Sequence, residues 1–277
     1  MIGTVENINL KINVNSTFLR ARPNHDQPRF EKKEDLSIKP SRYNTDYLRA
    51  STPLKTMFYS VYMSGNNCQN DYDIMRITGV YETIPEIRIP HMPYSGKITF
   101  GYWTNCQSLN LMAIMHKDLY ATRNPYTKEI IDSYNQHLSN CDSQLIQKSL
   151  LFYDFLADEF SKETIRGNYD YMISALFSEA ASRFNIDGII YPSVRLGGMS
   201  YNVALNQSAM KKLKLNSVEE ASVEQIDNNV RITVNAFVKL KENETNFTLT
   251  DVPLARTCCP SYYSQAKTAN FVTSGSI

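Results

Sequence analysis

The sequence predicts an α+β fold, and the order of its hydrophobic patterns carries that prediction. Segments with alternating apolar residues, typical of strands, are interspersed with segments of helical periodicity. The two kinds do not follow the strict strand–helix–strand alternation that builds a doubly wound parallel sheet. With 277 residues, 42% of them hydrophobic and 21% charged, the chain can form the core of one large domain.

The expected strands are short and are bounded by turn residues. Residues 56–63 alternate well enough for a strand, with Met57, Tyr59 and Val61 on one side. A strand at residues 17–22 ends at Pro23, and residues 24–41 form a charged, proline-containing loop. We expect the other strands at residues 97–104, 109–115, 188–191, 202–205 and 230–240.

One predicted helix begins near Asp71, a residue type that often caps helix N-termini. Ile74, Ile77 and Tyr81 then fall on one helical face, and Glu82 lies at or near the end of the helix. Three more helices are expected further along the chain, at residues 127–138, after a cap at Asp142, and at residues 169–184.

Charge and hydropathy disfavour several functional classes. The 29 basic residues nearly balance the 28 acidic ones, so no overall field favours nucleic acid or an anionic membrane. No stretch approaches the ~20 apolar residues of a membrane helix, and residues 1–15 do not resemble a signal peptide. The five scattered cysteines fit reduced thiols, so we expect a cytoplasmic protein.

Common motifs for metals and nucleotides are missing from the sequence. The four histidines are far apart, and the cysteines show no C-x-x-C spacing, so no metal site is expected. There is also no G-x-G-x-x-G loop, no Walker A loop and no G-x-S-x-G elbow. Any binding of a dinucleotide would therefore not use a Rossmann fold.

Four local clusters remain as candidates for chemistry. They are Phe18–Pro23 with the later Ser41–Asn44, then Met57–Ser60, then Val80–Thr83, and finally a long element that runs from Asp187 to Asn206. The last cluster contains Tyr191-Pro192-Ser193, a pair of glycines and Asn202. It is the most specific of the four, whereas the others gain weight from their order along the chain.

Taken in order, these clusters resemble the RES family, which is named for an arginine, a glutamate and a serine. Arg42, Glu82 and Ser193 match those three residues. Arg20 matches an early arginine of the family, Tyr59 a strand tyrosine, and Asn202 the asparagine after the turn. The resemblance spans about residues 17–240 and is closest to a longer branch of the family.

The chain also departs from the compact members of the family. Ser41 stands where they have glycine, and Tyr43 where they have tryptophan. The intervals from Arg42 to Tyr59 and from Tyr59 to Glu82 are longer, so Tyr62 and Glu86 are alternative matches close by.

The resemblance implies a fold and an activity. The fold would be similar to that of ADP-ribosyltransferases, with a bent, split, mixed β-sheet flanked by helices. The activity would be cleavage of the nicotinamide–ribose bond of NAD⁺, a substrate here, with no cofactor and no metal. Compact members are toxins held inactive by an antitoxin, so an antitoxin or other inhibitor protein is a possible partner, in a toxin or a defence role.

The chemistry explains why these residue types would be needed. Cleavage develops an oxocarbenium-like ribose, whose charge a carboxylate such as Glu82 stabilises. Arginine binds a diphosphate through its planar guanidinium, so Arg42 is the first candidate and Arg20 supports it. Tyr59 offers an aromatic face for nicotinamide, and Ser193 a hydroxyl for a ribose hydroxyl or the carboxamide.

Residues 17–243 would form the RES-like catalytic domain, and residues 244–277 a weakly ordered tail, because the hydrophobic pattern fades there. Two other functions remain open. One is mono-ADP-ribosylation of a protein, in which a side chain replaces water. The other is a non-catalytic binding or regulatory module that retains the fold.

Overall fold

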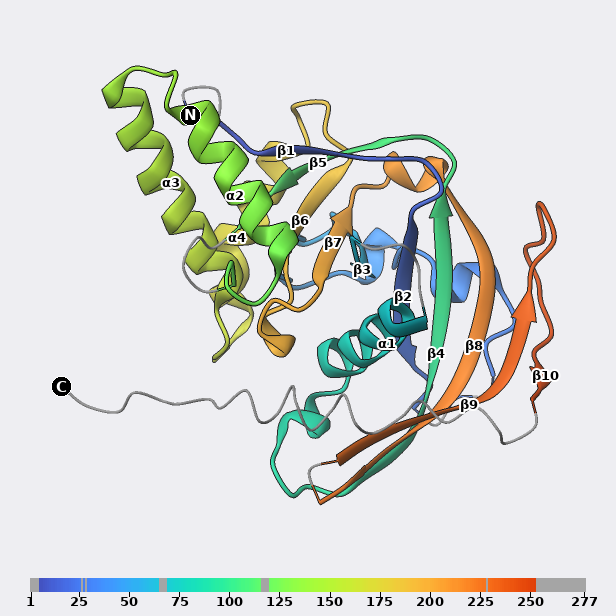
Figure 1. The fold of residues 1–277 in the computed structure, drawn as a ribbon. Helices are drawn as coiled ribbons and strands as arrows, with labels where there is room; N and C mark the ends of the chain where they lie inside the picture. Colours follow the sequence, from blue (N-terminus) through green and yellow to red (C-terminus); the bar gives the residue numbers. More distant parts are fainter. Residues whose placement is uncertain are drawn as a thin grey trace.

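The computed structural model describes residues 5–252 except 26, 28, 65–68, 116–119 and 228. These residues form an α+β fold with one large mixed sheet and four α-helices (Figure 1). The expected α+β class is therefore confirmed.

The sheet contains ten strands in the order β1-β5-β6-β7-β3-β2-β4-β8-β9-β10. All neighbouring strands are antiparallel except β5 and β6, which makes the sheet mixed. The strands are β1 (Asn9–Ile12), β2 (Thr17–Pro23), β3 (Phe58–Tyr62), β4 (Tyr94–Asn105), β5 (Leu109–Ala113), β6 (Gly188–Pro192), β7 (Tyr201–Leu205), β8 (Leu213–Ile226), β9 (Asn229–Lys239) and β10 (Thr250–Asp251).

The junction between β3 and β2, in the middle of the sheet, is narrow. Strands β3 and β2 pair only at Phe18 with Tyr62 and at Leu19 with Val61, although β2 goes on to pair with β4 as far as Pro23. Beyond Leu19, β2 therefore follows β4 and leaves β3. The backbone groups of β3 on that side, such as the carbonyl of Tyr59, then need other partners.

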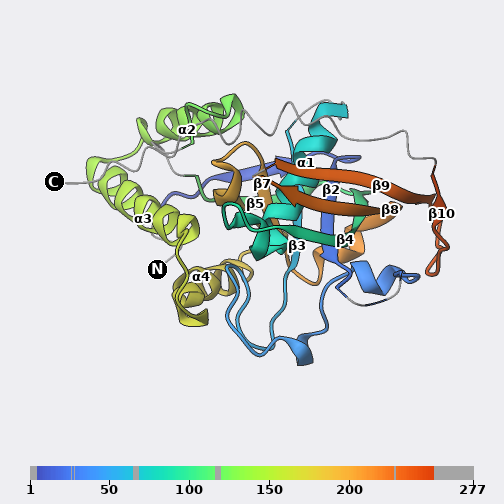
Figure 2. The same ribbon diagram turned by 90° about the horizontal axis from the view of Figure 1, so that it is seen from below.

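Helix α1 (Gln69–Thr83) packs on the half of the sheet that contains β2, β4 and β8 (Figures 1 and 2). Met75 and Val80 are buried there among apolar side chains of the strands, including Leu19 and Ile98. Gly79 faces β2 so closely that a Cβ at this position would lie 2.8 Å from the Cβ of Ala21. This close approach fixes the height of α1 above the sheet.

The other three helices cluster beside the β1, β5, β6 and β7 half of the sheet (Figures 1 and 2). They are α2 (Pro125–Leu138), α3 (Ser143–Ser161) and α4 (Met172–Ala181). Asp142 caps α3 by accepting from the amides of Gln144 and Leu145, as predicted. No helix within the described ranges is long and apolar enough to cross a membrane.

The elements agree with the sequence predictions at most positions, with the following differences. Strand β8 was not expected, and neither were β1 and β10 at the two ends of the described chain. Helix α1 begins at Gln69, so the prediction that Asp71 caps it is wrong; Asp71 lies in the first turn. Phe247 and Leu249 are buried in the core, so packing extends past residue 243, whereas residues 253–277 of the expected tail lie outside the described residues.

Two adjacent glutamates concealed β8 in the sequence. Glu219 and Glu220 are both buried within this strand. Arg76 of α1 binds Glu219 with two nitrogens, at 2.9 and 3.0 Å, and Tyr102 donates to the same carboxylate at 2.6 Å. Arg29 binds Glu220 at 3.0 Å. Buried charges of this kind are tolerated only when they are paired and hydrogen-bonded.

Replacing Gly79 by valine should lower the free energy of unfolding by about 1–3 kcal/mol, because the new side chain must push α1 away from Ala21 and Leu19. Gly167→Val is the matched control, since a Cβ at Gly167 meets nothing within 4 Å. Urea unfolding of both variants measures the difference. Equal stability of the two would show that α1 is not held against β2 as described.

Candidate functional site

The side chain of Glu82, on the last turn of α1, is the centre of the candidate site. Its Oε1 accepts hydrogen bonds from the hydroxyl of Ser193 and from the side-chain amide of Asn202, each 2.8 Å long. Within the described part of the chain, no hydrogen bond reaches Oε2. The structure therefore brings together three of the six residues that the sequence singled out. Ser193 and Asn202 lie 111 and 120 residues after Glu82 in the chain.

A tight turn between β6 and β7 places Ser193. The amide of Ser193 donates to the carbonyl of Ser200, and the amide of Gly198 donates to the carbonyl of Ser193, both at 2.8 Å. Gly197 and Gly198 have φ values of +57° and +82°, which glycine adopts without strain. The turn directs the buried Ser193 hydroxyl towards Glu82.

A second contact aligns α1 with this turn. The hydroxyls of Thr78 and Ser200 lie 2.8 Å apart. Thr78 precedes Glu82 by four residues, so both lie on the same face of the helix. One face of α1 thus contacts the start and the end of the β6–β7 connection.

Arg88 holds the end of α1, and sequence reasoning missed it. Its guanidinium donates to the carbonyls of Tyr81 and Glu82, at 2.7 and 2.8 Å, which are among the groups a helix end leaves unpaired. Burial lowers the pKa of Arg88, and the nearby positive charge of Arg195 lowers it further, while Glu82 opposes the shift. The usable sequence signal was a basic residue shortly after the predicted helix end.

Arg20 lies at the point where β2 leaves β3. Its Nη1 donates to the Tyr59 carbonyl at 3.0 Å, and its guanidinium lies over the Phe58 ring at 5.1 Å. Its Nε is buried without a hydrogen-bond partner, and no ion pair to a carboxylate of the described residues forms. Burial and then the charge of Arg22 lower the pKa of Arg20 to about 10. The guanidinium of Arg20 therefore has no anionic partner among the described residues.

The phenol of Tyr59 is engaged with a neighbouring loop. Its oxygen accepts from the amide of Ala50 at 3.0 Å and lies 2.9 Å from the Ser51 hydroxyl. Burial raises the pKa of Tyr59 to about 12, so the phenol stays protonated near neutral pH. Its ring packs against the buried side chains of Ala50, Met57 and Ala204.

The structure does not bring Arg42 into the Glu82 cluster. Arg42 is exposed on a short 3₁₀ turn, Ser41–Tyr43, and its guanidinium lies 4.8 Å from the centre of the Tyr43 ring. The adjacent Ser41 hydroxyl lies 3.3 Å from that of Thr56, just before β3. Arg42 thus sits beside the start of the strand that carries Tyr59, on the outer surface.

Asn124 is a further residue that the sequence did not reveal. Its Oδ1 caps α2 by accepting from the amides of Tyr126 and Thr127. Its Nδ2 donates to the Gly198 carbonyl at 3.1 Å, in the turn that follows Ser193. One side chain therefore ties the start of α2 to the turn that orients Ser193.

Tyr59→Phe should cost about 1–3 kcal/mol of stability, because the Ala50 amide and the Ser51 hydroxyl lose a shared partner. Tyr43→Phe, which removes a hydroxyl from an exposed ring, is the control. Thermal or urea unfolding of both proteins compares the two losses. If Tyr59→Phe is as stable as the control, the phenol does not anchor this loop.

Comparison with known proteins gave no match: no protein-family model matches the chain, and neither does any curated protein sequence.

Proposed function

We propose that this protein cleaves the nicotinamide–ribose bond of NAD⁺ and releases nicotinamide and ADP-ribose. The observation that carries the proposal is the shared carboxylate oxygen of Glu82, to which Ser193 and Asn202 both donate. The sequence resemblance points to the same three residues. Their convergence on one oxygen supports the assignment of the three residues to one site.

The two hydrogen bonds support a defined role for the carboxylate. The two donors to Oε1 fix the orientation of the group. They leave Oε2 to face a substrate. A fixed negative charge beside the ribose stabilises the positive charge that develops as the bond to nicotinamide breaks.

The reaction balances without a further reagent. The electron pair of the C1′–N bond goes to nicotinamide and neutralises its cationic ring nitrogen. Water then adds to C1′ and releases one proton to solvent, so NAD⁺ and water give nicotinamide, ADP-ribose and H⁺. In this scheme Ser193 and Asn202 are positioning residues that act through Glu82.

Arg20 is the proposed partner for the diphosphate. Leu19, Val61 and Asn202 are register partners across β2, β3 and β7, and Arg20 directly follows Leu19. Neighbouring strands lie about 4.8 Å apart, so the backbone of Arg20 lies about 10 Å from that of Asn202. Side chains alternate along a strand, so Arg20 points to the face of the sheet opposite the one on which Leu19 and Ala21 meet α1. A guanidinium with no carboxylate partner among the described residues suits a diphosphate, and this ranks Arg20 above the exposed Arg42.

We further propose that the sheet is of the ADP-ribosyltransferase type. The two-pair junction between β3 and β2 supports this, because it separates the strands next to Arg20 and Tyr59. A gap between strands in the middle of a sheet exposes backbone groups that a ligand can bind.

Glu82→Gln should reduce nicotinamide release on the order of a thousandfold, because the amide keeps the shape but loses the charge. Binding of NAD⁺ should persist, since the ground-state contacts come from other residues. Glu86→Gln, an exposed carboxylate in the turn after α1, is the control.

The measurement is chromatography of free nicotinamide beside calorimetric binding of NAD⁺. Normal turnover by Glu82→Gln would exclude the proposed role of this carboxylate. If Glu86→Gln is the inactive variant, the glutamate was misassigned.

Arg20→Met should abolish stabilisation by ADP-ribose, because the diphosphate loses its cation. With the wild-type chain, ADP-ribose at about 100 times its dissociation constant should add about 2.7 kcal/mol of stability and raise the melting temperature. Arg183→Met, at an exposed arginine on the surface beyond α4, serves as the control.

Arg42→Met tests the original assignment in the same thermal-shift assay. If only Arg42→Met loses the stabilisation by ADP-ribose, Arg42 and not Arg20 binds the diphosphate. Unchanged shifts in both variants would place the diphosphate elsewhere.

A further inference from the structure

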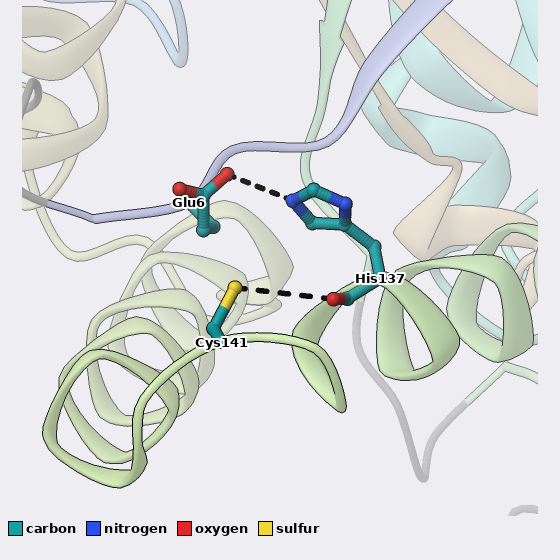
Figure 3. Close-up of side chains that lie close together, drawn as sticks. All are labelled: Glu6, His137 and Cys141. Atoms are coloured by element: carbon teal, nitrogen blue, oxygen red, sulfur yellow. Dashed lines mark hydrogen bonds and ion pairs between the residues drawn. The ribbon is translucent and has the colours of Figure 1, made fainter.

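Three potential metal ligands meet on the side of the molecule where α2 and α3 join (Figure 3). They are the carboxylate of Glu6, the imidazole of His137 and the thiol of Cys141. The His137 Nε2 lies 2.9 Å from a carboxylate oxygen of Glu6. One ligand atom from each residue lies within 4.8 Å of the others.

The fold holds the backbone of Glu6 from both sides. Its amide donates to the Ser149 hydroxyl of α3 at 3.0 Å, and its carbonyl accepts from the Tyr134 hydroxyl of α2 at 2.9 Å. The segment before β1 is therefore clamped between the two helices. These backbone contacts hold Glu6 in the position from which its side chain reaches His137.

The end of α2 and the residues just after it supply the other two ligands. His137 is the penultimate residue of α2, and Cys141 follows four residues later, after the helix end at Leu138. The Cys141 thiol lies 3.9 Å from the His137 carbonyl (Figure 3). Spacing of three intervening residues at a helix end brings both side chains to the same side of the chain.

We propose that Glu6, His137 and Cys141 bind a divalent cation of the zinc class. Thiolate, imidazole and carboxylate together suit zinc, whereas calcium and magnesium prefer oxygen ligands only. Bond lengths of about 2.0–2.3 Å to zinc would draw the three ligand atoms somewhat closer than they lie here. Because all three side chains are at least partly exposed, a water molecule can complete the tetrahedron.

The consequence of binding would be mechanical and independent of the NAD⁺ reaction. The ion would link the segment before β1 to the end of α2, and so connect the first strand of the sheet to the helical cluster. A bound ion would also protect the Cys141 thiol from oxidation, because the coordinated sulfur is no longer a free nucleophile.

Cobalt(II) titration of the reduced, full-length protein tests the site, because a thiolate bound to cobalt gives a charge-transfer absorption. The wild-type chain should show this band at one equivalent, and added zinc should remove it. Cys141→Ser should abolish the band, and His137→Gln should weaken cobalt binding at least about tenfold. Cys106→Ser and the double variant Cys258→Ser, Cys259→Ser are matched thiol controls that should retain it.

Thermal unfolding provides a second readout that does not depend on the thiol. Zinc should raise the melting temperature of the wild-type chain and leave that of Glu6→Gln unchanged. Glu6 is the ligand that would link the segment before β1 to the end of α2. A band that persists in Cys141→Ser, or that disappears in the tail double variant, would overturn the proposal. So would the absence of any band in the wild-type protein.

Discussion

The carboxylate of Glu82 is the point at which separate parts of this structure depend on one another. It lies in the last turn of α1 and binds Ser193 in the β6–β7 connection and Asn202 in β7. Those strands belong to one half of the sheet, and α1 packs on the other half. The two halves share only two residue pairs at the β3–β2 junction, so these hydrogen bonds bridge a narrow place in the middle of the sheet.

Charged side chains inside this fold differ in whether they have a partner of opposite charge, and this difference distinguishes structural residues from candidate functional ones. Glu219 and Glu220 are buried, but Arg76 and Arg29 neutralise them within the fold. Among the described residues no carboxylate pairs with Arg20, whose Nε is buried, and burial lowers its pKa to about 10. Since a buried cation group without a partner costs free energy, it is the better indicator of a ligand.

Local chemistry in the sequence predicted much of the fold. Asp142 caps α3, and residues 188–191 and 202–205 lie in β6 and β7. Strand β8 escaped prediction because Glu219 and Glu220 look exposed until Arg76 and Arg29, from distant segments, are placed beside them. Such tertiary pairing overrides any alternating pattern in the strand itself.

The candidate site was predictable as a set of residues but not as a geometry. The order of motifs selected Glu82, Ser193 and Asn202, yet nothing in the spacing could show that two donors share one carboxylate oxygen. Arg42 was chosen by position in a motif, and the structure places it on the surface beside Tyr43. Arg88 and Asn124 act by capping helix ends next to the site, a role visible only once the helix ends are known.

Incubation of the purified wild-type protein with NAD⁺, with nicotinamide and ADP-ribose measured together, tests the central claim most directly. The account predicts that both products form in equal amounts and that the mass of the protein does not change. No nicotinamide at high protein concentration would contradict it. Nicotinamide without free ADP-ribose, together with a gain of one ADP-ribosyl group on a protein, would show transfer to a side chain in place of hydrolysis.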